Sequence, residues 1–283
     1  MPVAVVVPTI RPASYEKFLK AWFPFIEKHD ASLIKVVDGE NPTAGGKTVK
    51  EIMGKDADLI FNKNDGVRNL GFAYIAKYLP QVEVIITLDD DVLPYEDPIQ
   101  SHLEALRLNV STSWVSTASE FMRGFPYSVR NESEVVLSHG VWEGVKDYDA
   151  PTQLVNGNKD VTFYKGVIPK GVYYPMCGMN IAFKRKMLPY MYFAPMGYRV
   201  GMDRFADIWL GVTSKRIIDR NGWAVVSGYA KVKHERASNV FKNLQKEAKG
   251  LELNETFWQG DEKDPYFKLY RENRKRWEKF ING

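Results

Sequence analysis

Continuous apolar runs alternate with helical spacing along the first ninety residues. The runs are rich in β-branched residues and lack the polar alternation of half-exposed strands, which is typical of strands buried on both faces. The predicted strands are Val3–Val7, Leu33–Val37, Leu59–Phe61 and Val82–Leu88, and the predicted helices are Tyr15–Lys28, Lys47–Met53 and Arg68–Tyr78. This alternation predicts an α/β fold with a parallel sheet and right-handed crossovers.

The pattern is less regular after residue 90. The predicted elements there are a helix over Ile99–Leu108, returns to the sheet over Gly171–Cys177 and Asn180–Phe183, a helix over Asp203–Ile217 and a short strand over Ala224–Ser227. Residues 242–283 are charged and helical. We therefore expect a catalytic α/β domain over 1–245 and a C-terminal helical extension over 246–283, which packs across the domain or mediates assembly of a homo-oligomer.

Composition narrows the class of protein. The chain has 283 residues, a net charge of +4 and 45% apolar residues, as expected for a globular α/β domain with an appendage. Basic residues are spread out until Arg271–Lys279, so nucleic-acid binding is not expected. Cys177 is the single cysteine, which excludes an intrachain disulfide and a zinc cluster. With no run of eighteen apolar residues and no basic leader, we expect no membrane span and a cytoplasmic location.

Charged and turn-forming residues follow the predicted strands at their carboxyl ends. Thr9 and Arg11 follow the first strand, Asp38 follows the second, and three aspartates follow Val82–Leu88. Ligands of open parallel sheets bind beyond this edge. Since neither GxGxxG nor GxxxxGK[ST] is present, a dinucleotide site and a P-loop are not favoured.

The three consecutive aspartates, Asp89, Asp90 and Asp91, call for a positive partner, because crowded carboxylates repel one another. Residues i and i+2 point to the same side, so Asp89 and Asp91 are expected to face a ligand and Asp90 to face away. Carboxylate oxygens suit magnesium or manganese, which leave positions open for phosphate oxygens. The motif predicts a divalent ion that carries a nucleotide diphosphate, and the alternatives are a solvated acidic loop or a helix cap.

Several segments resemble a known family. VPTIRP (7–12), VVDGE (36–40), GVRNLGFAY (66–74) and TLDDDVLP (87–94) follow the order of a nucleotide-sugar-binding GT-A fold. FMRGFPYSVR (121–130), SHGVWEGVKDYDAPTQL (138–154), IPKGVYYPMCGMNIAF (168–183) and HERASNVFKNLQKE (234–247) closely resemble the reversibly glycosylated polypeptides, a family that includes the plant UDP-arabinopyranose mutases. The resemblance implies a GT-A (Rossmann-like) fold with a mostly parallel central sheet and a helical C-terminal tail.

The resemblance implies a metal site and a nucleotide site. Asp91 corresponds to the aspartate that binds the metal, Asp89 to one that approaches the ribose or a metal-bound water, and His234 to a histidine that completes the manganese (or magnesium) shell. Without the family, a lone histidine such as His234 is more often a structural or surface residue than a metal ligand. Residues expected to hold or flank the UDP part are Thr9, Arg11, Asp38, Arg68, Asp89 and Asp90, although Asp38-Gly39 alone is also a simple turn.

Two arginines carry the family's covalent chemistry. Arg123 matches the arginine that becomes glycosylated, and Arg130 matches a second arginine needed for activity. A guanidinium stays charged and is a poor nucleophile, so a close anion or a sugar cation would be needed. The alternative is that both arginines clamp the diphosphate.

One departure concerns sugar specificity. The segment DRFADIWLG (203–211) matches a block with two adjacent acids in the plant proteins, but here Ala206 replaces the first and Asp207 alone remains as a catalytic candidate. Asp203 lies one helical turn earlier and is expected to reach the same face. Three aromatic residues are expected either to line a sugar pocket or to fill the core: Trp142, Tyr148 and Trp209. Cys177 is expected to be a packed thiol.

The function implied is a metal-dependent UDP-arabinopyranose mutase, with UDP-sugar as substrate and a possible glycosyl-arginine intermediate. A UDP-sugar-dependent glycosyltransferase, or a self-glycosylating protein, shares the first half of that mechanism. A nucleotide-sugar-binding protein without turnover is the third alternative.

Overall fold

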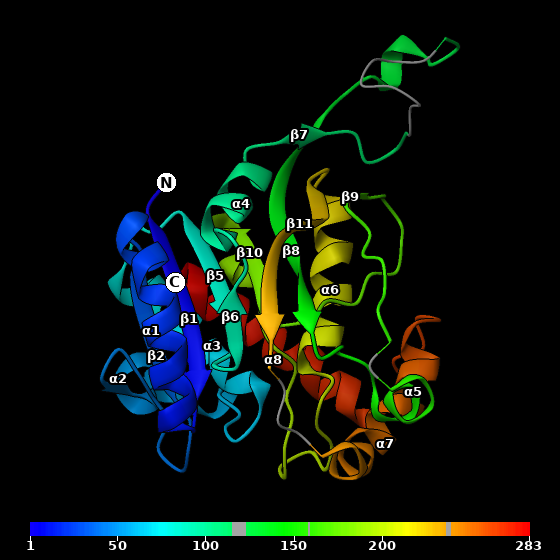
Figure 1. The fold of residues 1–283 in the computed structure, drawn as a ribbon. Coiled ribbons are helices and arrows are strands. Elements are labelled where there is room, and N and C mark those ends of the chain that lie inside the picture. Colours follow the sequence, from blue (N-terminus) through cyan, green and yellow to red (C-terminus); the bar gives the residue numbers. More distant parts are fainter. Residues whose placement is uncertain (115–122, 158, 236–238) are drawn as a thin grey trace.

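The computed structural model describes residues 1–114, 123–157, 159–235 and 239–283. Within them lies an 11-stranded mixed sheet of order β4-β3-β2-β1-β5-β10-β8-β11-β6, with β7 beside β8 and β9 beside β11 (Figure 1). The strands are β1 Val3–Thr9, β2 Ser32–Val37, β3 Thr43–Ala44, β4 Lys47–Thr48, β5 Val84–Leu88, β6 Val92–Pro94, β7 Asn109–Val110, β8 Ser133–Gly144, β9 Gly166–Ile168, β10 Asn180–Lys184 and β11 Ala224–His234.

The longer strands run mostly in one direction, which confirms the expected α/β class. β1 pairs in parallel with β2 and β5, and β8 pairs in parallel with β11. β10 is antiparallel to both β5 and β8, so β8 and β11 run in the direction of β1. The carboxyl ends of these five strands therefore meet at one edge of the sheet, where the ligand site was expected.

Helices cover one face of the sheet through α1 (Pro12–Lys28) and α4 (Pro98–Ala105), which lie in front of it in Figure 1. Alternate residues of β1, Val3, Val5 and Val7, point to this face. They share a core with Phe18 and Trp22 of α1. This two-residue alternation, with both sets buried, explains why the sequence of β1 is a continuous apolar run.

The other face is covered by α3 (Arg68–Tyr78), α6 (Ala206–Arg220) and α8 (Pro265–Asn282). Ala4 and Val6 point to this side. α3 lies close to the sheet because residue 71 is glycine; a Cβ there would overlap the Val6 side chain. This close approach brings the first residue of α3, Arg68, beneath the carboxyl edge of β5.

The C-terminal helices share the main core. The remaining helices are α2 Val49–Met53, α5 Ala150–Asn156 and α7 Val240–Phe257, with 3-10 turns η1 Gly54–Leu59, η2 Asp65–Val67, η3 Tyr127–Val129 and η4 Arg185–Tyr190. Phe257, Tyr266, Tyr270 and Trp277 are buried in the cluster that also holds Trp209 of α6. Residues 246–283, expected as an extension, thus contribute core aromatics in addition to a charged surface.

Two predicted strands are wrong, and several observed strands were not predicted. Leu59–Phe61 and Gly171–Cys177 form no strand. Leu59 and Phe61 are nevertheless buried. An apolar run signals burial and does not by itself show strand pairing. The longest strand that was not predicted is β8, a 12-residue strand whose centre carries the buried polar residues Ser138 and His139.

Ser138 and His139 are stabilised by partners distant in sequence. His102 Nδ1 lies 2.9 Å from Ser138 Oγ, and His139 Nδ1 lies 3.2 Å from Ser227 Oγ. The two polar residues interrupt the apolar run of β8. Their partners lie on α4 and β11, so the local sequence does not show that Ser138 and His139 are buried. None of the described helices combines the length and apolar character required to cross a bilayer.

Candidate functional site

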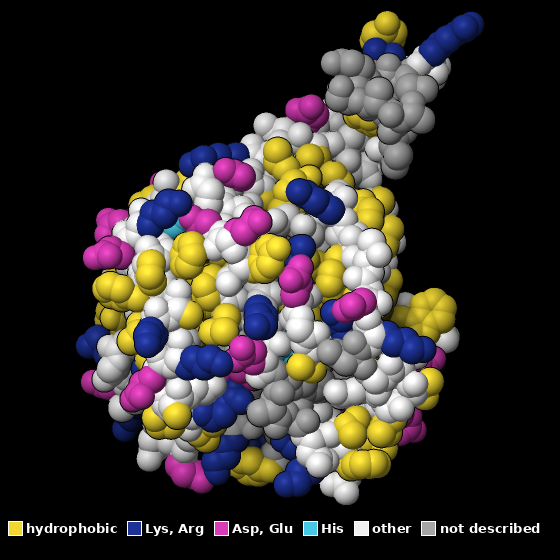
Figure 2. All heavy atoms as spheres, in the orientation of Figure 1, with side chains coloured by type: hydrophobic (Ala, Val, Ile, Leu, Met, Phe, Trp, Pro, Cys, Tyr) yellow, Lys and Arg dark blue, Asp and Glu magenta, His cyan; other side chains and the backbone are white. Residues whose placement is uncertain are grey.

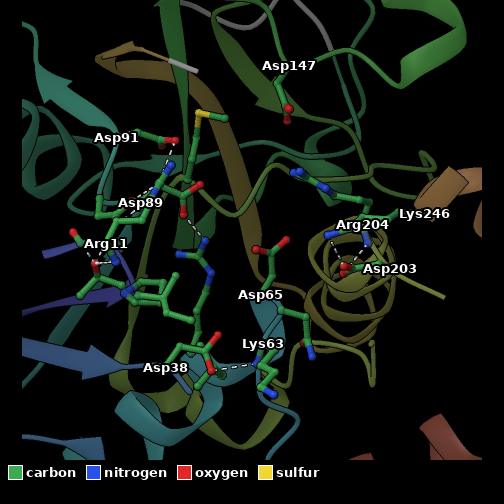
Figure 3. A pocket seen from close by; sticks show the side chains of 18 of the residues that line it. Arg11, Asp38, Lys63, Asp65, Asp89, Asp91, Asp147, Asp203, Arg204 and Lys246 are labelled. Carbon is green, nitrogen blue, oxygen red and sulfur yellow. Dashed lines mark hydrogen bonds and ion pairs between the residues drawn. The ribbon is translucent and has the colours of Figure 1, made fainter. Parts of the chain in front are cut away.

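A pocket of about 370 Å³ opens at the carboxyl edge of β1, β2 and β5 (Figure 3). Of the residues predicted to bind the nucleotide or a metal, those that line it are Thr9, Arg11, Asp38, Arg68, Asp89, Asp90, Asp91 and His234. The structure thus brings together side chains that lie up to 225 residues apart in the sequence. The pocket also has lining residues that sequence reasoning did not single out, described below.

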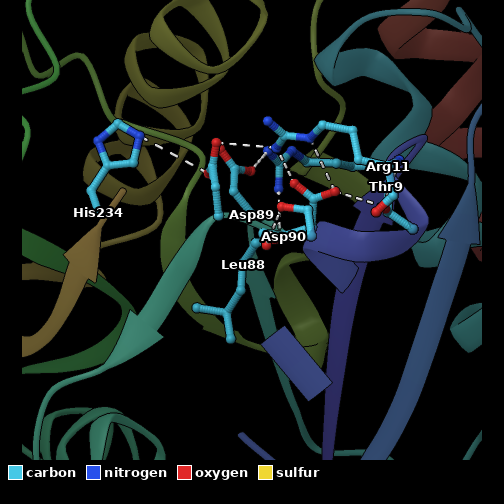
Figure 4. A network of polar contacts seen from close by, with 9 residues as sticks. Thr9, Arg11, Leu88, Asp89, Asp90 and His234 are labelled. Atoms are coloured by element: carbon cyan, nitrogen blue, oxygen red, sulfur yellow. Dashed lines mark hydrogen bonds and ion pairs between the residues drawn. The ribbon is translucent and has the colours of Figure 1, made fainter. Parts of the chain in front are cut away.

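Asp90 ties the end of β5 to the end of β1 (Figure 4). Its carboxylate is 5% exposed and accepts a hydrogen bond from Thr9 Oγ1 at 2.6 Å. Arg11 forms an ion pair with Asp90 and a second one with Asp91 Oδ2 at 3.1 Å. The carboxylate of Asp90 is therefore directed to β1 and holds Thr9 and Arg11 in place. Asp90 was expected to face away from the ligand, but it lines the pocket, because the chain turns after β5 ends at Leu88.

Asp89 is paired with the buried guanidinium of Arg68. Arg68 is 2% exposed, forms an ion pair with Asp89, and also donates to Thr87 Oγ1 at 2.9 Å. Burial by itself raises the pKa of Asp89, but the charge and hydrogen bond of Arg68 hold that pKa below its ordinary value. Part of the positive charge that the aspartates require is thus supplied by the protein, through Arg11 and Arg68.

Asp91 and His234 lie next to each other at the pocket. Asp91 Oδ1 is buried without a hydrogen-bond partner and lies 4.0 Å from His234 Nε2. His234 Nδ1 is 2.9 Å from the carbonyl oxygen of Val145; since a carbonyl only accepts, Nδ1 carries the proton and the Nε2 lone pair is directed toward Asp91. Burial, followed by the charge of Asp89, raises the pKa of Asp91.

These two residues fit a divalent ion that shares its other positions with substrate. In the described part of the chain, no group of three or more His, Cys, Asp or Glu side chains forms a complete metal cage. Magnesium and manganese are commonly held by one or two protein carboxylates together with phosphate oxygens and water. The unpaired oxygen of Asp91 and the free nitrogen of His234 agree with such an open site.

Asp38 forms the wall at the end of β2. Its Oδ1 accepts hydrogen bonds from the backbone N–H groups of Gly39 and Lys63, both at 2.8 Å. Burial raises the pKa of Asp38, and these two hydrogen bonds partly offset the effect. A carboxylate fixed by one oxygen leaves the other available for an N–H or O–H group of a ligand.

A second pocket of about 410 Å³ adjoins the first, and both are lined by Asp65, Arg68, Asp89 and Asp147. The predicted residues Trp142, Tyr148, Cys177 and Asp207 line this second pocket. Trp209 is instead fully buried in the core, as the alternative interpretation held.

Buried carboxyls surround the second pocket. Burial, with added repulsion from Asp65 and Asp147, raises the pKa of Asp207 to about 8. Asp207 accepts hydrogen bonds from the N–H of Gly178 at 2.7 Å and of Ile208 at 2.9 Å. Burial also raises the pKa of Asp65 to about 6. The pocket therefore offers groups that exchange protons near neutral pH.

The single cysteine is not activated. Cys177 Sγ donates to Asp147 Oδ2 at 3.0 Å, and the Cys177 N–H donates to Nε2 of His139. Burial and then the charge of Asp147 raise the pKa of the Cys177 thiol. His139 accepts at Nε2, and burial lowers its pKa to about 3, so it does not promote the thiolate.

The two predicted arginines lie outside both pockets. Arg130 donates to the carbonyl oxygen of Phe125 and stacks on Tyr127, 3.8 Å from the ring centroid; Arg123 is exposed. They precede β8, whose far end pairs with His234. The 12 residues of β8 span on the order of 36 Å. In Figures 1 and 2 the segment projects from the opposite end of the molecule, with basic side chains toward its tip.

A comparison with sequence models of protein families identifies the family of the chain. The sequence model described as "Reversibly glycosylated polypeptide" matches residues 2–262. The chain belongs to the reversibly glycosylated polypeptide family. The resemblance inferred from the motifs is thereby confirmed, and it extends beyond the residue 247 at which the motifs end.

Relatives of this reversibly glycosylated polypeptide match most of its length. "Probable UDP-arabinopyranose mutase 4" of Arabidopsis thaliana is 35% identical over 297 residues, which cover 94% of this chain and 77% of that protein. "UDP-arabinopyranose mutase 1" of Arabidopsis thaliana is 36% identical, and the match covers 91% of this chain and 76% of that protein. "UDP-arabinopyranose mutase 1" of Oryza sativa subsp. japonica is 35% identical, with 91% of this chain and 75% of that protein matched.

Solved structures resemble this family member more weakly. A197 from STIV has a TM-score of 0.42 at 12% identity, covering 84% of this chain and 87% of that one. A mutant of a Drosophila β1,4-galactosyltransferase 7, in complex with manganese, UDP-Gal and xylobiose, has a TM-score of 0.39 at 11% identity, covering 84% of this chain and 72% of that one.

Ala206, which stands where the plant proteins have the first of two adjacent acids, is buried. Ala206 is 0% exposed and lines neither pocket, and its carbonyl oxygen accepts from the N–H of Ala194. Asp203 lines the first pocket and Asp207 the second. In this reversibly glycosylated polypeptide, alanine at position 206 thus leaves the carboxylates of both pockets in place.

Several pocket residues were missed by sequence reasoning. These are Lys63, Asn64, Asp65, Asp147, Arg204 and Lys246 in the first pocket. Asp203 was expected to share a face with Asp207, but Asp203 lines the first pocket and Asp207 the second. Asp65 carried a usable signal, because it follows the apolar run Leu59–Phe61, as Asp38 and Asp89 follow apolar runs that do form strands. Lys246 carried none, since it lies among several lysines on a charged helix and only the fold directs it toward the pocket.

Proposed function

We propose that this chain is an enzyme that interconverts UDP-arabinopyranose and UDP-arabinofuranose with the help of a divalent ion. Relatives named UDP-arabinopyranose mutase match more than nine tenths of the chain. The observation that carries the proposal is the pocket in which Asp89, Asp91 and His234 meet at the carboxyl edge. That edge is where nucleotide ligands of open α/β sheets bind.

The proposal places the UDP part in the first pocket. Asp38 presents a carboxylate oxygen to an N–H or O–H group of the nucleoside, beside Thr9 and Arg11. Asp91 and His234 would hold manganese or magnesium, which would neutralise diphosphate charge and stabilise the departing UDP. Arg68 and Arg11 keep Asp89 and Asp91 oriented before substrate binds.

The sugar then occupies the second pocket. The change from a six- to a five-membered ring exchanges which sugar oxygen is bonded to the anomeric carbon, so one hydroxyl loses a proton and another oxygen gains one. Asp207 and Asp65, with pKa values raised to about 8 and about 6, are placed to move those protons. Trp142 and Tyr148 supply apolar surface that excludes water.

A glycosyl-arginine intermediate at Arg123 carries a structural requirement. Arg123 and Arg130 would have to reach the second pocket through movement of their segment or from a neighbouring molecule. Mass spectrometry of the intact protein, and of Arg123→Lys, after incubation with UDP-arabinopyranose would test this step. We expect a pentose adduct on the wild type that Arg123→Lys lacks; an adduct at another residue would refute the assignment.

A UDP-sugar-dependent glycosyltransferase, or a self-glycosylating protein, is the second candidate. One observation favours it: the second pocket has about 410 Å³ and aromatic walls, which suit a separate sugar acceptor.

A cytoplasmic location and a homo-oligomer remain predictions.

The test of function is incubation of the protein with UDP-arabinopyranose and manganese, followed by separation of nucleotide sugars. We expect a UDP-arabinofuranose peak that Asp91→Asn does not produce. Accumulation of free UDP without that peak would favour a transferase, and no change with any UDP-sugar would favour a binding protein.

A further inference from the structure

One wall of the first pocket is built from the segment before α6 and from α7. Figure 3 shows Asp203, Arg204 and Lys246 together on this wall, across the pocket from Asp89 and Asp91. The N–H of Asp203 donates to the carbonyl oxygen of Lys246 at 3.2 Å, and Lys246 Nζ lies 3.4 Å from Asp203 Oδ2. Asp203 thus joins Lys246 to the segment that carries Arg204, through one main-chain and one side-chain contact.

Packing fixes this wall in place. The Arg204 guanidinium donates to Oδ1 of Asn243 at 2.9 Å, and Asn243 is 2% exposed on α7. One turn beyond Lys246, glycine at position 250 lets α7 contact the buried ring of Phe205 directly, since a Cβ there would overlap ring atoms. A side chain held by a packed helix keeps its geometry better than one on a free loop.

The backbone of Arg204 is strained. Its φ of 74° lies in the left-handed region, which favours glycine and costs free energy for a residue with a Cβ. Strained residues of this kind gather at ligand sites, where the side chain is needed. The observed outlier therefore points to a role for the guanidinium that glycine would not fill.

The cationic side chains that line the first pocket differ in whether they already form ion pairs. Arg11 and Arg68 are paired with the strand-end aspartates, and Lys63 is paired with a glutamate outside the pocket. Among the described residues, Arg204 forms no direct ion pair and makes one side-chain hydrogen bond, to a neutral amide, although its charge partly offsets the burial that raises the pKa of the nearby Asp65. The side chain of Lys246 is 52% exposed. Arg204 is thus available to an anion, and Lys246 becomes available when it exchanges Asp203 for a phosphate oxygen.

We propose that Arg204 and Lys246 bind the diphosphate of the nucleotide sugar, from the wall opposite Asp91 and His234. The proposal rests on the proposed function, because it takes a UDP-sugar as the ligand. A guanidinium matches two phosphate oxygens at once, and a lysine ammonium adds a mobile charge. This clamp takes the place that was expected for Arg130.

The clamp has a direct chemical consequence. When the bond between the sugar and the diphosphate breaks, negative charge grows on the departing UDP, and fixed cations nearby stabilise it. Asp203 holds Lys246 near the pocket until a phosphate oxygen takes the place of the Asp203 carboxylate. The clamp therefore acts on both binding and leaving-group departure.

The test compares binding of UDP and uridine by isothermal titration calorimetry. Arg204→Gly removes the charge and is expected to fold, because glycine accepts the positive φ. Lys246→Gln removes the second charge, and Lys249→Gln is the matched control, an exposed lysine on the same helix that lines neither pocket. We expect UDP affinity to fall about 10-fold or more in the first two variants and to stay unchanged in the control. Uridine affinity should stay unchanged in all three.

The outcomes separate the clamp from the proposed function. UDP affinities of Arg204→Gly and Lys246→Gln equal to that of Lys249→Gln would overturn the clamp alone. A wild-type protein that binds UDP no better than uridine would also overturn it while keeping a nucleoside site. A wild-type protein that binds neither would remove the proposed function and the clamp with it. Lys246→Gln changes an exposed side chain, so it decides alone if Arg204→Gly does not fold.

Discussion

Replacing Arg68 by methionine should destabilise the protein strongly while leaving the shape of the site intact. Arg68 is 2% exposed, and methionine would lose its ion pair with Asp89 and its hydrogen bonds to Thr87 Oγ1 (2.9 Å) and to the carbonyl oxygen of Leu88 (3.3 Å). Breaking a buried pair costs about 3–5 kcal/mol, and the lower end of that range applies here, because the Asp89 side chain left without a partner is 29% exposed. We therefore expect the free energy of unfolding, measured in urea, to fall by about that amount.

The double variant Arg68→Met/Asp89→Asn separates the charge effect from packing. Because it removes both charges, it should recover most of the loss and unfold within about 1–2 kcal/mol of the wild type. The mutase activity of the double variant should stay low, since Asp89 faces the nucleotide in the proposed site. A single variant that loses less than about 1 kcal/mol, or a double variant no more stable than the single, would refute the reasoning.

Three further predictions follow from packing and from the cysteine. Gly250→Ala should lower the free energy of unfolding by about 1–3 kcal/mol in urea, because the new Cβ overlaps the buried ring of Phe205; an unchanged midpoint would show that α7 adjusts freely. Trp277→Ala should cost about 3–5 kcal/mol in the same assay, since the side chain is 0% exposed, and a loss below about 1 kcal/mol would contradict its place in the core. Cys177 should react with iodoacetamide at about pH 8 roughly 10-fold more slowly than free cysteine, because its raised pKa leaves little thiolate, and Asp147→Asn should speed the reaction by removing a nearby negative charge; equal rates in wild type and variant would contradict this.

The sequence predicted those elements whose burial is set by short-range periodicity. β1, β2, β5, α1 and α3 were expected close to their observed bounds, because continuous β-branched runs and helical apolar faces are local signals. The meeting of Asp89, Asp91 and His234 followed from the rule that parallel strands end at one edge, together with the family resemblance. The pocket contains all three.

The remainder depends on contacts between distant segments. Buried Ser138 and His139 interrupt the apolar pattern of β8, since the groups that satisfy them lie on α4 and β11. Arg204 and Lys246 become neighbours only after α7 packs on the segment before α6. Motif similarity placed Arg123 in the site, whereas the structure places it beyond the other end of β8, which no local pattern reveals.

The most direct measurement is a manganese titration followed by electron paramagnetic resonance of free Mn²⁺, with UDP present. Asp91→Asn and His234→Ala would be compared with wild type, and His29→Gln would serve as control, because His29 pairs with Asp97 and lines neither pocket. The account predicts that wild type and control bind manganese, and that each of the two variants binds it about 10- to 100-fold more weakly. Equal manganese affinity in all four proteins would contradict the assignment of Asp91 and His234 as the metal site.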